Sequence, residues 1–417
     1  MSYNLFGSEF KSDPHSVYAQ MRQDNPIYCR PAFYGERVMW FITRYDDVAE
    51  VLRDHQRFVK SLRTTMTAGE LAQLAADSPV LDPVMELMNN HMLNLDVPNH
   101  TRLRSLVNKA FTARVVSQMQ GRIQRFADQL IDKVQARKQM DLVEQYAYPL
   151  PINMIADLIG VPPKDRHKFR LWSSGLVSPS STANRNPKKY ERTKRIIEDF
   201  TDYLQRLFDE HRLLMEQGAQ PDDDLITQLL QAEEDGDKLS ESELFSMMIL
   251  LIVAGYDTTV NLISNGALLL LQHPAQLDLL MREPERFPNT IEEIMRYESP
   301  VDRATMRFVA TDLEFHGHAM KRGDAVSLVL GSAGRDERQF DNPDVFDITR
   351  ENVRHLGFGF GIHYCLGAPL ARLEGQIALE TLFRRLPNLR LDIEIDKLKW
   401  RTNPILRGAQ RMPVRWD

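Results

Sequence analysis

Cys365 is the residue whose surroundings point most clearly to chemistry. It follows a glycine-rich stretch that begins at His355, and from Leu366 to Leu386 apolar residues recur every three or four positions, which predicts a helix. Cys365 is therefore expected where a loop enters a helix N-terminus. Unpaired N–H groups and the helix dipole favour a thiolate over a thiol at such a place. A thiolate held by backbone donors is a good axial ligand for iron.

The glycines before Cys365 stand at alternate positions, a spacing that is unfavourable both in a helix and in a regular strand. They predict a tight turn and a close approach of the backbone to a neighbour. Taken alone, the cysteine could be an inert core residue, as most lone cysteines in intracellular proteins are. The whole spacing, Phe-Gly-x-Gly-x-His-x-Cys-x-Gly, resembles the haem-thiolate loop of the cytochrome P450 family. The matching positions are Phe358, Gly359, Gly361, His363, Cys365 and Gly367.

This resemblance implies that Cys365 ligates haem iron and that His363 meets a haem propionate. A second family stretch, Asp-x-Pro-x-His-x-x-x-Arg, places His100 and Arg104 one turn apart at a helix start. In isolation that pair would indicate a solvated face, but in the family it meets a propionate. Arg303, just after the prolyl break at Ser299-Pro300, matches a further propionate arginine. Enclosing a propionate carboxylate in the protein costs free energy unless charged donors hydrogen-bond to it.

A long helix is predicted from about Glu241 to Gln272, apolar nearly all round at 247–254. Gly255 costs about 1 kcal/mol in a helix interior, and Thr258 can bond back to the Ala254 carbonyl and open the helix there. By itself this indicates a kink with a capped acid at Asp257. The stretch also resembles the family's Ala-Gly-x-Asp-Thr-Thr segment. That resemblance implies that Thr258 hydrogen-bonds dioxygen and that Asp257 relays the protons needed to cleave it.

A structural trio is implied by the family's Glu-x-x-Arg pair. Glu293 and Arg296 match that pair, and Arg350 is the expected third member, together holding the scaffold of the cysteine loop. Alone, such a spacing would indicate only an exposed ion pair worth little. The resemblance also offers candidate substrate contacts after the prolyl break, in the central helix and in a C-terminal hairpin tip. These candidates are Ala254, Val301, Ala304 and Ile405.

Composition narrows the class of protein. The 417 residues carry a net charge of −6 and no basic block interleaved with aromatics, which argues against nucleic-acid binding. The two cysteines, Cys29 and Cys365, have no zinc spacing and indicate a reducing cytoplasm. The N-terminus shows neither a signal peptide nor a membrane anchor, and the apolar run at 247–256 is too short to cross a bilayer. A cytoplasmic protein is expected.

The resemblance covers roughly residues 10 to 415 and implies a single cytochrome P450 domain over 1–417, mainly α with a smaller β-rich portion. It implies haem b and a monooxygenase that hydroxylates or epoxidises a small lipophilic substrate, of the soluble type found in bacterial secondary metabolism. We expect a monomer. No redox module fits within the chain, so electrons would come from a separate ferredoxin or flavodoxin and its reductase. Candidate docking residues, which could equally be ordinary solvated charges, are Arg102, Lys109, Arg114 and Arg372.

Two other functions remain open at this point. A peroxide-driven peroxygenase or a haem-thiolate isomerase or dehydratase would keep the haem but change the reaction, although Asp257 and Thr258 suit dioxygen activation better. A non-enzymatic haem sensor would need an output domain, for which the sequence shows no sign. The sequence does not name the substrate.

Overall fold

The computed structural model describes residues 2–32, 37–77, 90–176, 187–218, 224–234 and 236–417. Its chain divides into two compact units. The first comprises Met1–Met66, Gln118–Leu150 and Asp257–Asp417, and the second comprises Thr67–Ser117 and Pro151–Tyr256.

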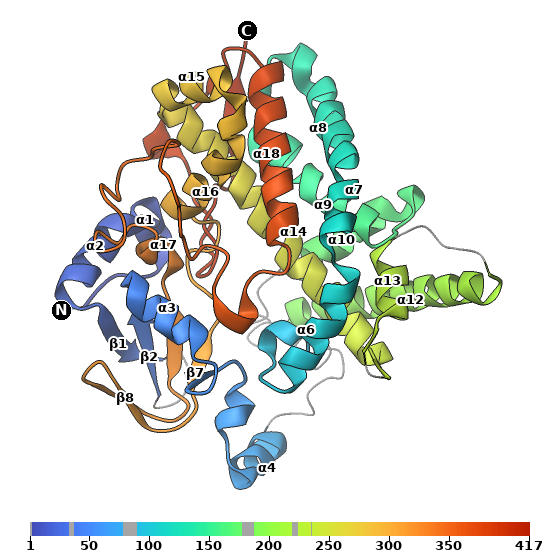
Figure 1. The fold of residues 1–417 in the computed structure, drawn as a ribbon, viewed down its shortest axis with the longest axis vertical. Helices are drawn as coiled ribbons and strands as arrows, with labels where there is room; N and C mark the ends of the chain where they lie inside the picture. Colours follow the sequence, from blue (N-terminus) through green and yellow to red (C-terminus); the bar gives the residue numbers. More distant parts are fainter. Residues whose placement is uncertain (1, 33–36, 78–89, 177–186, 219–223, 235) are drawn as a thin grey trace. The chain divides into compact units, whose positions relative to one another are not determined.

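In the first unit, α18 packs against α8 and α16 (Figure 1). The start of α2 is fixed by Asp13, whose side chain accepts a hydrogen bond from the Ser16 amide, and by Pro14 at the first position. The helices are α1 (Gly7–Ser12), α2 (Pro14–Asp24), α3 (Tyr45–Arg53), α8 (Gln120–Val134), α15 (Pro274–Arg282), α16 (Phe287–Tyr297), α17 (Leu330–Ala333) and α18 (Ala368–Arg385).

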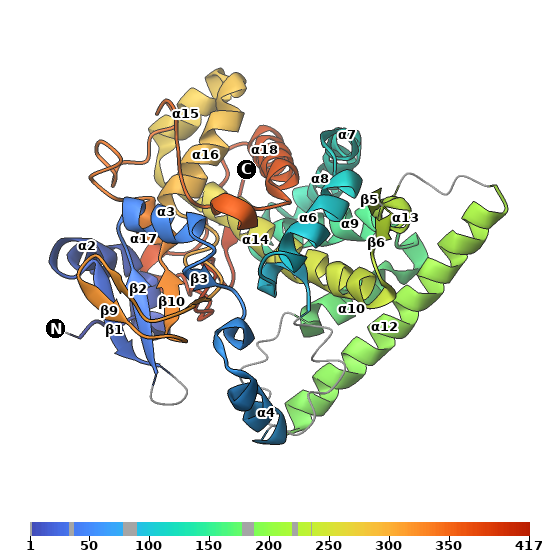
Figure 2. The same cartoon turned by 60° about the horizontal axis from the view of Figure 1, so that its bottom comes forward.

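A five-stranded sheet in the order β1-β2-β10-β7-β3 belongs to the same unit, and Figure 2 shows β1, β2 and β10 side by side. Its strands are β1 (Ile27–Pro31), β2 (Val38–Ile42), β10 (Ala325–Leu328), β7 (Arg307–Val309) and β3 (Phe58–Val59). The pair β10–β2 is parallel, and the other pairs are antiparallel. Smaller sheets join β11 (Arg390–Leu391), β12 (Pro413–Arg415) and β4 (Gln139–Asp141), and β8 (Leu313–Phe315) with β9 (His318–Met320).

The second unit is built mostly from helices, with α10 packed on α12 and α6 packed on α13. A short pair of strands, β5 (Glu233–Glu234) and β6 (Asp237–Lys238), lies before the long central helix. The helices are α4 (Ala68–Asp77), α6 (Asn99–Ala110), α7 (Ala113–Gln118), α9 (Pro149–Leu158), α10 (Arg166–Leu176), α12 (Pro187–Glu216) and α13 (Leu225–Gln231).

The helix α14 (Glu241–Gln272) has the bounds that its apolar pattern predicts, and the division between the two units falls within it, after Tyr256. Among the described residues it is the one helix long and apolar enough to cross a membrane, but 72% of its most apolar window is buried inside the protein. Such burial is typical of a core helix. In its middle, Ala254 is exposed and Thr258 is half-buried.

Candidate active site

The cysteine loop turns where its glycines allow it to. Gly361 has a φ of +73°, a left-handed conformation that a side chain would strain, and a Cβ there would lie 2.7 Å from the Leu52 carbonyl oxygen of α3. The Cys365 amide donates to the Phe358 carbonyl at 2.9 Å, which closes the loop. Cys365 is half-buried and precedes the start of α18 by three residues, as its helix-start position predicted.

A charged brace connects this loop to α16 and α18. Glu292 accepts two hydrogen bonds from Arg372, at 2.6 and 2.9 Å, and one from His355 at 3.1 Å. The Arg372 guanidinium also lies 4.4 Å from the centre of the Phe358 ring. Burial alone would raise the pKa of Glu292, but the hydrogen bonds from Arg372 and His355 lower it to about 2. The carboxylate therefore stays charged over the working pH range and holds the loop from two sides.

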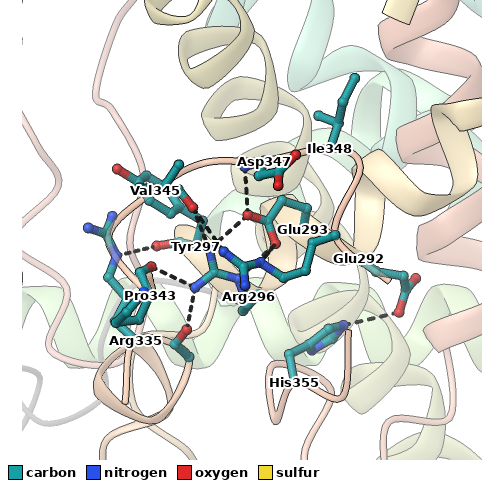
Figure 3. Close-up of polar contacts among 12 residues, drawn as sticks. Glu292, Glu293, Arg296, Tyr297, Arg335, Pro343, Val345, Asp347, Ile348 and His355 are labelled. Atoms are coloured by element: carbon teal, nitrogen blue, oxygen red, sulfur yellow. Dashed lines mark hydrogen bonds and ion pairs between the residues drawn. The ribbon is translucent and has the colours of Figure 1, made fainter. Parts of the chain in front are cut away.

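Arg296 organises the segment that leads to the loop (Figure 3). It is fully buried, and all five of its N–H donors have acceptors. Two bonds go to the Glu293 carboxylate, both at 2.7 Å. Three go to backbone carbonyls, those of Gly334 at 2.8 Å, Pro343 at 2.7 Å and Val345 at 3.0 Å.

The third member of the trio also reaches Glu293, since Arg350 Nε lies 3.4 Å from its carboxylate. Glu293 accepts in addition from the Asp347 amide at 2.9 Å. The structure thus brings Glu293, Arg296 and Arg350 together as the sequence resemblance implies. A Cβ at Gly334 would lie 2.1 Å from the Arg296 carbonyl oxygen, so glycine is what this packing accommodates.

Two close contacts set α14 beside α18. A Cβ at Gly375 would lie 3.0 Å from Leu262, and one at Gly266 would lie 2.8 Å from Leu379, so small residues let the two helices approach. One turn before Leu262 on α14, the Thr259 hydroxyl donates to the Glu374 carboxyl group of α18. Residue numbers rise together along this pairing, so the two helices run in the same direction. Cys365 therefore lies at the same end of the helix pair as Asp257 and Thr258.

Glu374 is a buried acid that the sequence reasoning did not single out. It is 2% exposed, its Oε1 has no hydrogen-bond partner among the described residues, and burial raises its pKa to about 8. The hydrogen bond from Thr259 opposes that rise. A protonatable group thus lies beside the Asp257–Thr258 turn, held neutral at pH 7. Glu374 lies nine residues after Cys365, on the helix that the loop enters. That position is the sequence feature that could have identified it as a candidate site residue.

The raised pKa of Glu374 makes stability depend on pH. Because the folded-state pKa is higher than the unfolded one, the stabilisation is complete below about pH 4.5 and is lost as pH rises through about 8. Glu374→Gln should remove this loss and make the protein more stable than wild type at pH 9, by on the order of 2–4 kcal/mol. Urea unfolding at pH 5, 7 and 9 measures the effect. Glu380→Gln, on the exposed side of α18, serves as the control, and equal pH slopes for both variants would contradict the assignment.

Asp257 has a cation partner from far along the chain. It is 6% exposed, and its Oδ1 accepts from Arg401 Nη1 at 3.0 Å. The Arg401 side chain is 28% exposed, so it connects the buried carboxylate with solvent. No local pattern points to Arg401, because 144 residues separate it from Asp257.

The other predicted residues lie on several elements. His363 ends the 3-10 helix Gly361–His363, two residues before Cys365. His100 and Arg104 lie on successive turns of α6 in the second unit, where His100 is 2% exposed. Val301 and Ala304 are half-buried in the first unit, and Ile405 is exposed at its hairpin tip.

The contacts of Arg303, which is expected to meet a propionate, lie in the N-terminal segment. Its Nη2 donates to the Leu5 carbonyl at 2.9 Å and its Nε to the Tyr18 hydroxyl at 3.4 Å. The guanidinium lies 5.2 to 5.4 Å from the ring centres of Phe6, Phe10 and Phe41. These contacts direct Arg303 into the packing of the N-terminal segment. Sequence position relative to Pro300 could not reveal them, because they depend on residues almost 300 positions earlier.

Arg102 and Arg372, two of the candidate docking residues, form ion pairs with carboxylates of the chain. Arg102 pairs with Asp237 at 2.9 Å and with Glu243. Arg372 is engaged with Glu292, as described above. Lys109 and Arg114 are exposed on α6 and α7.

Comparison with known proteins agrees with this geometry. Residues 168–389 match the family described as Cytochrome P450. The polyketide biosynthesis cytochrome P450 PksS of Bacillus subtilis is 40% identical over 99% of this chain and 98% of its own. The chain belongs to the cytochrome P450 family.

Other P450 relatives support the same assignment. The cytochrome P450 monooxygenase PikC of Streptomyces venezuelae is 39% identical over 100% of this chain and 94% of its own. The solved structure of Bacillus subtilis PksS superposes with a TM-score of 0.89 at 39% identity, covering 100% of both chains. This chain therefore has the P450 fold and is a P450 monooxygenase, which implies a haem-iron cofactor.

The residues present fit such a group. The described residues contain no cluster of three or more His, Cys, Asp or Glu that could hold a metal ion by themselves. Iron carried in a porphyrin needs only one protein ligand, and Cys365 is a half-buried thiol outside any disulfide, in a closed loop at a helix start. The donor chemistry is thus that of a haem-thiolate site.

Proposed function

We propose that this P450 binds haem b through Cys365 and uses dioxygen to hydroxylate or epoxidise a small lipophilic substrate in the cytoplasm. Separate redox proteins supply the electrons. The observation that supports this best is the pairing of α14 with α18, joined by Thr259 and Glu374, because it puts Cys365 and the Asp257–Thr258 turn at one end of two packed helices. An iron ligand and groups able to deliver protons are the two things that reaction requires.

Charged side chains would hold the haem propionates. His363, His100 and Arg104 have the required chemistry, since charged donors offset the cost of enclosing a carboxylate. Arg307, which is 3% exposed on β7, replaces Arg303 in this role, because it is the other buried arginine of the same segment. The trio around Glu293 and the brace around Glu292 position the loop and take no part in the chemistry.

When bound, the haem supplies the iron at which dioxygen is reduced. This chain's residues supply protons and orientation. Asp257 pairs with the partly exposed Arg401, so its carboxylate can pass protons inward from solvent. The Thr258 hydroxyl can hold a water molecule for the next transfer, and neutral Glu374 provides a second proton source through Thr259.

Arg401→Met should lower the rate of product formation about tenfold while substrate affinity stays unchanged, because Asp257 loses the cation that orients it. Arg401→Lys should recover part of the rate. The measurement is product formed per electron consumed, with a surrogate ferredoxin and reductase. Asp257→Asn combined with Arg401→Met should be no worse than Asp257→Asn alone. If the rate losses caused by the two substitutions were additive, Arg401 would act through a group other than Asp257.

The substrate class is supported by what relatives are named for. The 6-deoxyerythronolide B hydroxylase of Saccharopolyspora erythraea is 36% identical to this chain. Solved P450s of similar fold include one in complex with testosterone and one in complex with myristic acid. These molecules are apolar with few polar groups, which defines the probes for a substrate screen. A fatty acid carried on acyl carrier protein, as in the P450BioI complex, belongs in the same screen.

The deciding experiment is the absorption spectrum of the reduced protein with carbon monoxide, followed by titration with those probes. A strongly red-shifted Soret band and a low-to-high-spin shift with at least one lipophilic probe are expected. A Soret band without the red shift would refute thiolate ligation. Efficient turnover with peroxide alone, together with a silent Thr258→Ala substitution, would favour a peroxygenase instead.

A further inference from the structure

Lys11, near the end of α1, is a buried lysine that connects two distant segments. It is 2% exposed, and its Nζ lies 3.3 Å from Asp302 Oδ2 and 3.2 Å from the Leu406 carbonyl oxygen. Asp302 adjoins the candidate substrate contact Val301, and Leu406 adjoins the candidate contact Ile405. One ammonium group thus reaches both segments at the residues next to those contacts.

The two segments also pair with each other through their backbones. Val301 and Leu406 form an antiparallel bridge. The amides of Asp302 and Arg303 both donate to the Ile405 carbonyl, at 2.8 and 3.1 Å. These bonds are few, and Ile405 lies at an exposed tip, so the pairing has little regular sheet to hold its register. Lys11 adds a side-chain link across it.

The acceptor of Lys11 is itself fixed from the N-terminal segment. Asp302 is 1% exposed and also accepts from the Tyr18 hydroxyl at 2.9 Å. Arg407, on the far side of Leu406, donates back to the Lys11 carbonyl. Lys11 is therefore bonded through its side chain and its backbone to residues 302, 406 and 407. Removing its charge would leave the Asp302 carboxylate buried with less compensation.

We propose that Lys11 is a positioning residue for substrate specificity: it fixes the register of segments 300–304 and 404–408, and through them the placement of Val301 and Ile405. The link to specificity rests on the proposed function, in which those two residues face the substrate. The fixed register of the two segments does not depend on the proposed function. A purely structural role would stabilise the N-terminus without changing the shape of the substrate site.

The first arm of the test needs no haem. Lys11→Met should accelerate amide hydrogen exchange about tenfold in peptides covering 300–304 and 404–408. Arg22→Met is the matched control, because Arg22 is also a buried cation of the N-terminal helices but donates to Ser332 and Glu337. Equal acceleration in both variants, or none in Lys11→Met, overturns the proposal. If Lys11→Met does not fold, Lys11→Met with Asp302→Asn removes both charges and carries the same test.

The second arm measures the shape of the site with two azoles that bind haem iron. Lys11→Met should change the ratio of the dissociation constants for 4-phenylimidazole and imidazole by about tenfold, since only the larger ligand reaches the walls. Arg22→Met should leave the ratio unchanged, and Ile405→Ala should abolish the effect of Lys11→Met. An unchanged ratio in Lys11→Met refutes the role in specificity. A wild-type protein whose spectrum no azole shifts would instead refute the proposed function.

Discussion

Cys365→Ser should abolish the red-shifted Soret band of the reduced, carbon monoxide-bound protein and reduce turnover by at least about two orders of magnitude. A serine hydroxyl stays protonated where a cysteine forms a thiolate, so the iron would lose its anionic sulfur ligand. The loop itself should survive, because its closing bond is between the Cys365 amide and the Phe358 carbonyl and does not use the side chain.

Cys29→Ser is the control for Cys365→Ser. Cys29 is the other cysteine of the chain and is exposed on β1. Its substitution should leave the spectrum and the turnover unchanged. If Cys29→Ser lost the band, or if Cys365→Ser kept it, the assignment of the iron ligand would be wrong.

Arg296→Met should destabilise the protein by about 3–5 kcal/mol, the usual cost of breaking a buried ion pair. It would leave the fully buried Glu293 without its bidentate partner and the carbonyls of Gly334 and Pro343 without donors, while the Val345 carbonyl would keep only a 3.4 Å bond from Arg350. Chemical denaturation measures the loss. Arg384→Met, which removes an exposed pair with Glu380 on α18, should cost less than about 1 kcal/mol.

A double variant separates the two parts of that loss. Glu293→Leu with Arg296→Met removes the buried carboxylate that has lost its bidentate partner, but it still leaves the carbonyls of Gly334 and Pro343 without donors. Stability should therefore recover in part. Full recovery would mean that the carbonyl contacts contribute nothing, and no recovery would mean that the ion pair does not dominate.

Sequence patterns predicted the parts of this molecule that depend on neighbours along the chain. The helical pattern that predicts α14 ends where the helix does, because helix bounds follow local periodicity and capping. Glu293 and Arg296 were visible as a pair since they lie three residues apart on α16.

Partners that are distant along the chain could not be predicted in this way. Arg401 reaches Asp257, and Lys11 reaches Asp302, through the tertiary fold, and nothing near those basic residues in the sequence distinguishes them from solvated charges. Arg372 was counted among such surface charges although it braces the cysteine loop. Arg303 was assigned by its place after Pro300, whereas three aromatic rings of the N-terminal half determine its direction.

Arg296 binds the 341–345 segment through backbone carbonyl oxygens of that segment. The side chains of this surface segment can therefore change during evolution without loss of these bonds. Every amino acid offers the same carbonyl oxygen, so the segment can exchange its side chains without losing its shape. Asn342 is an exception, because its φ of +47° favours asparagine or glycine. Val345, which is 54% exposed, should accept almost any residue. Mutational scanning should find a permissive surface beside an arginine that tolerates no replacement.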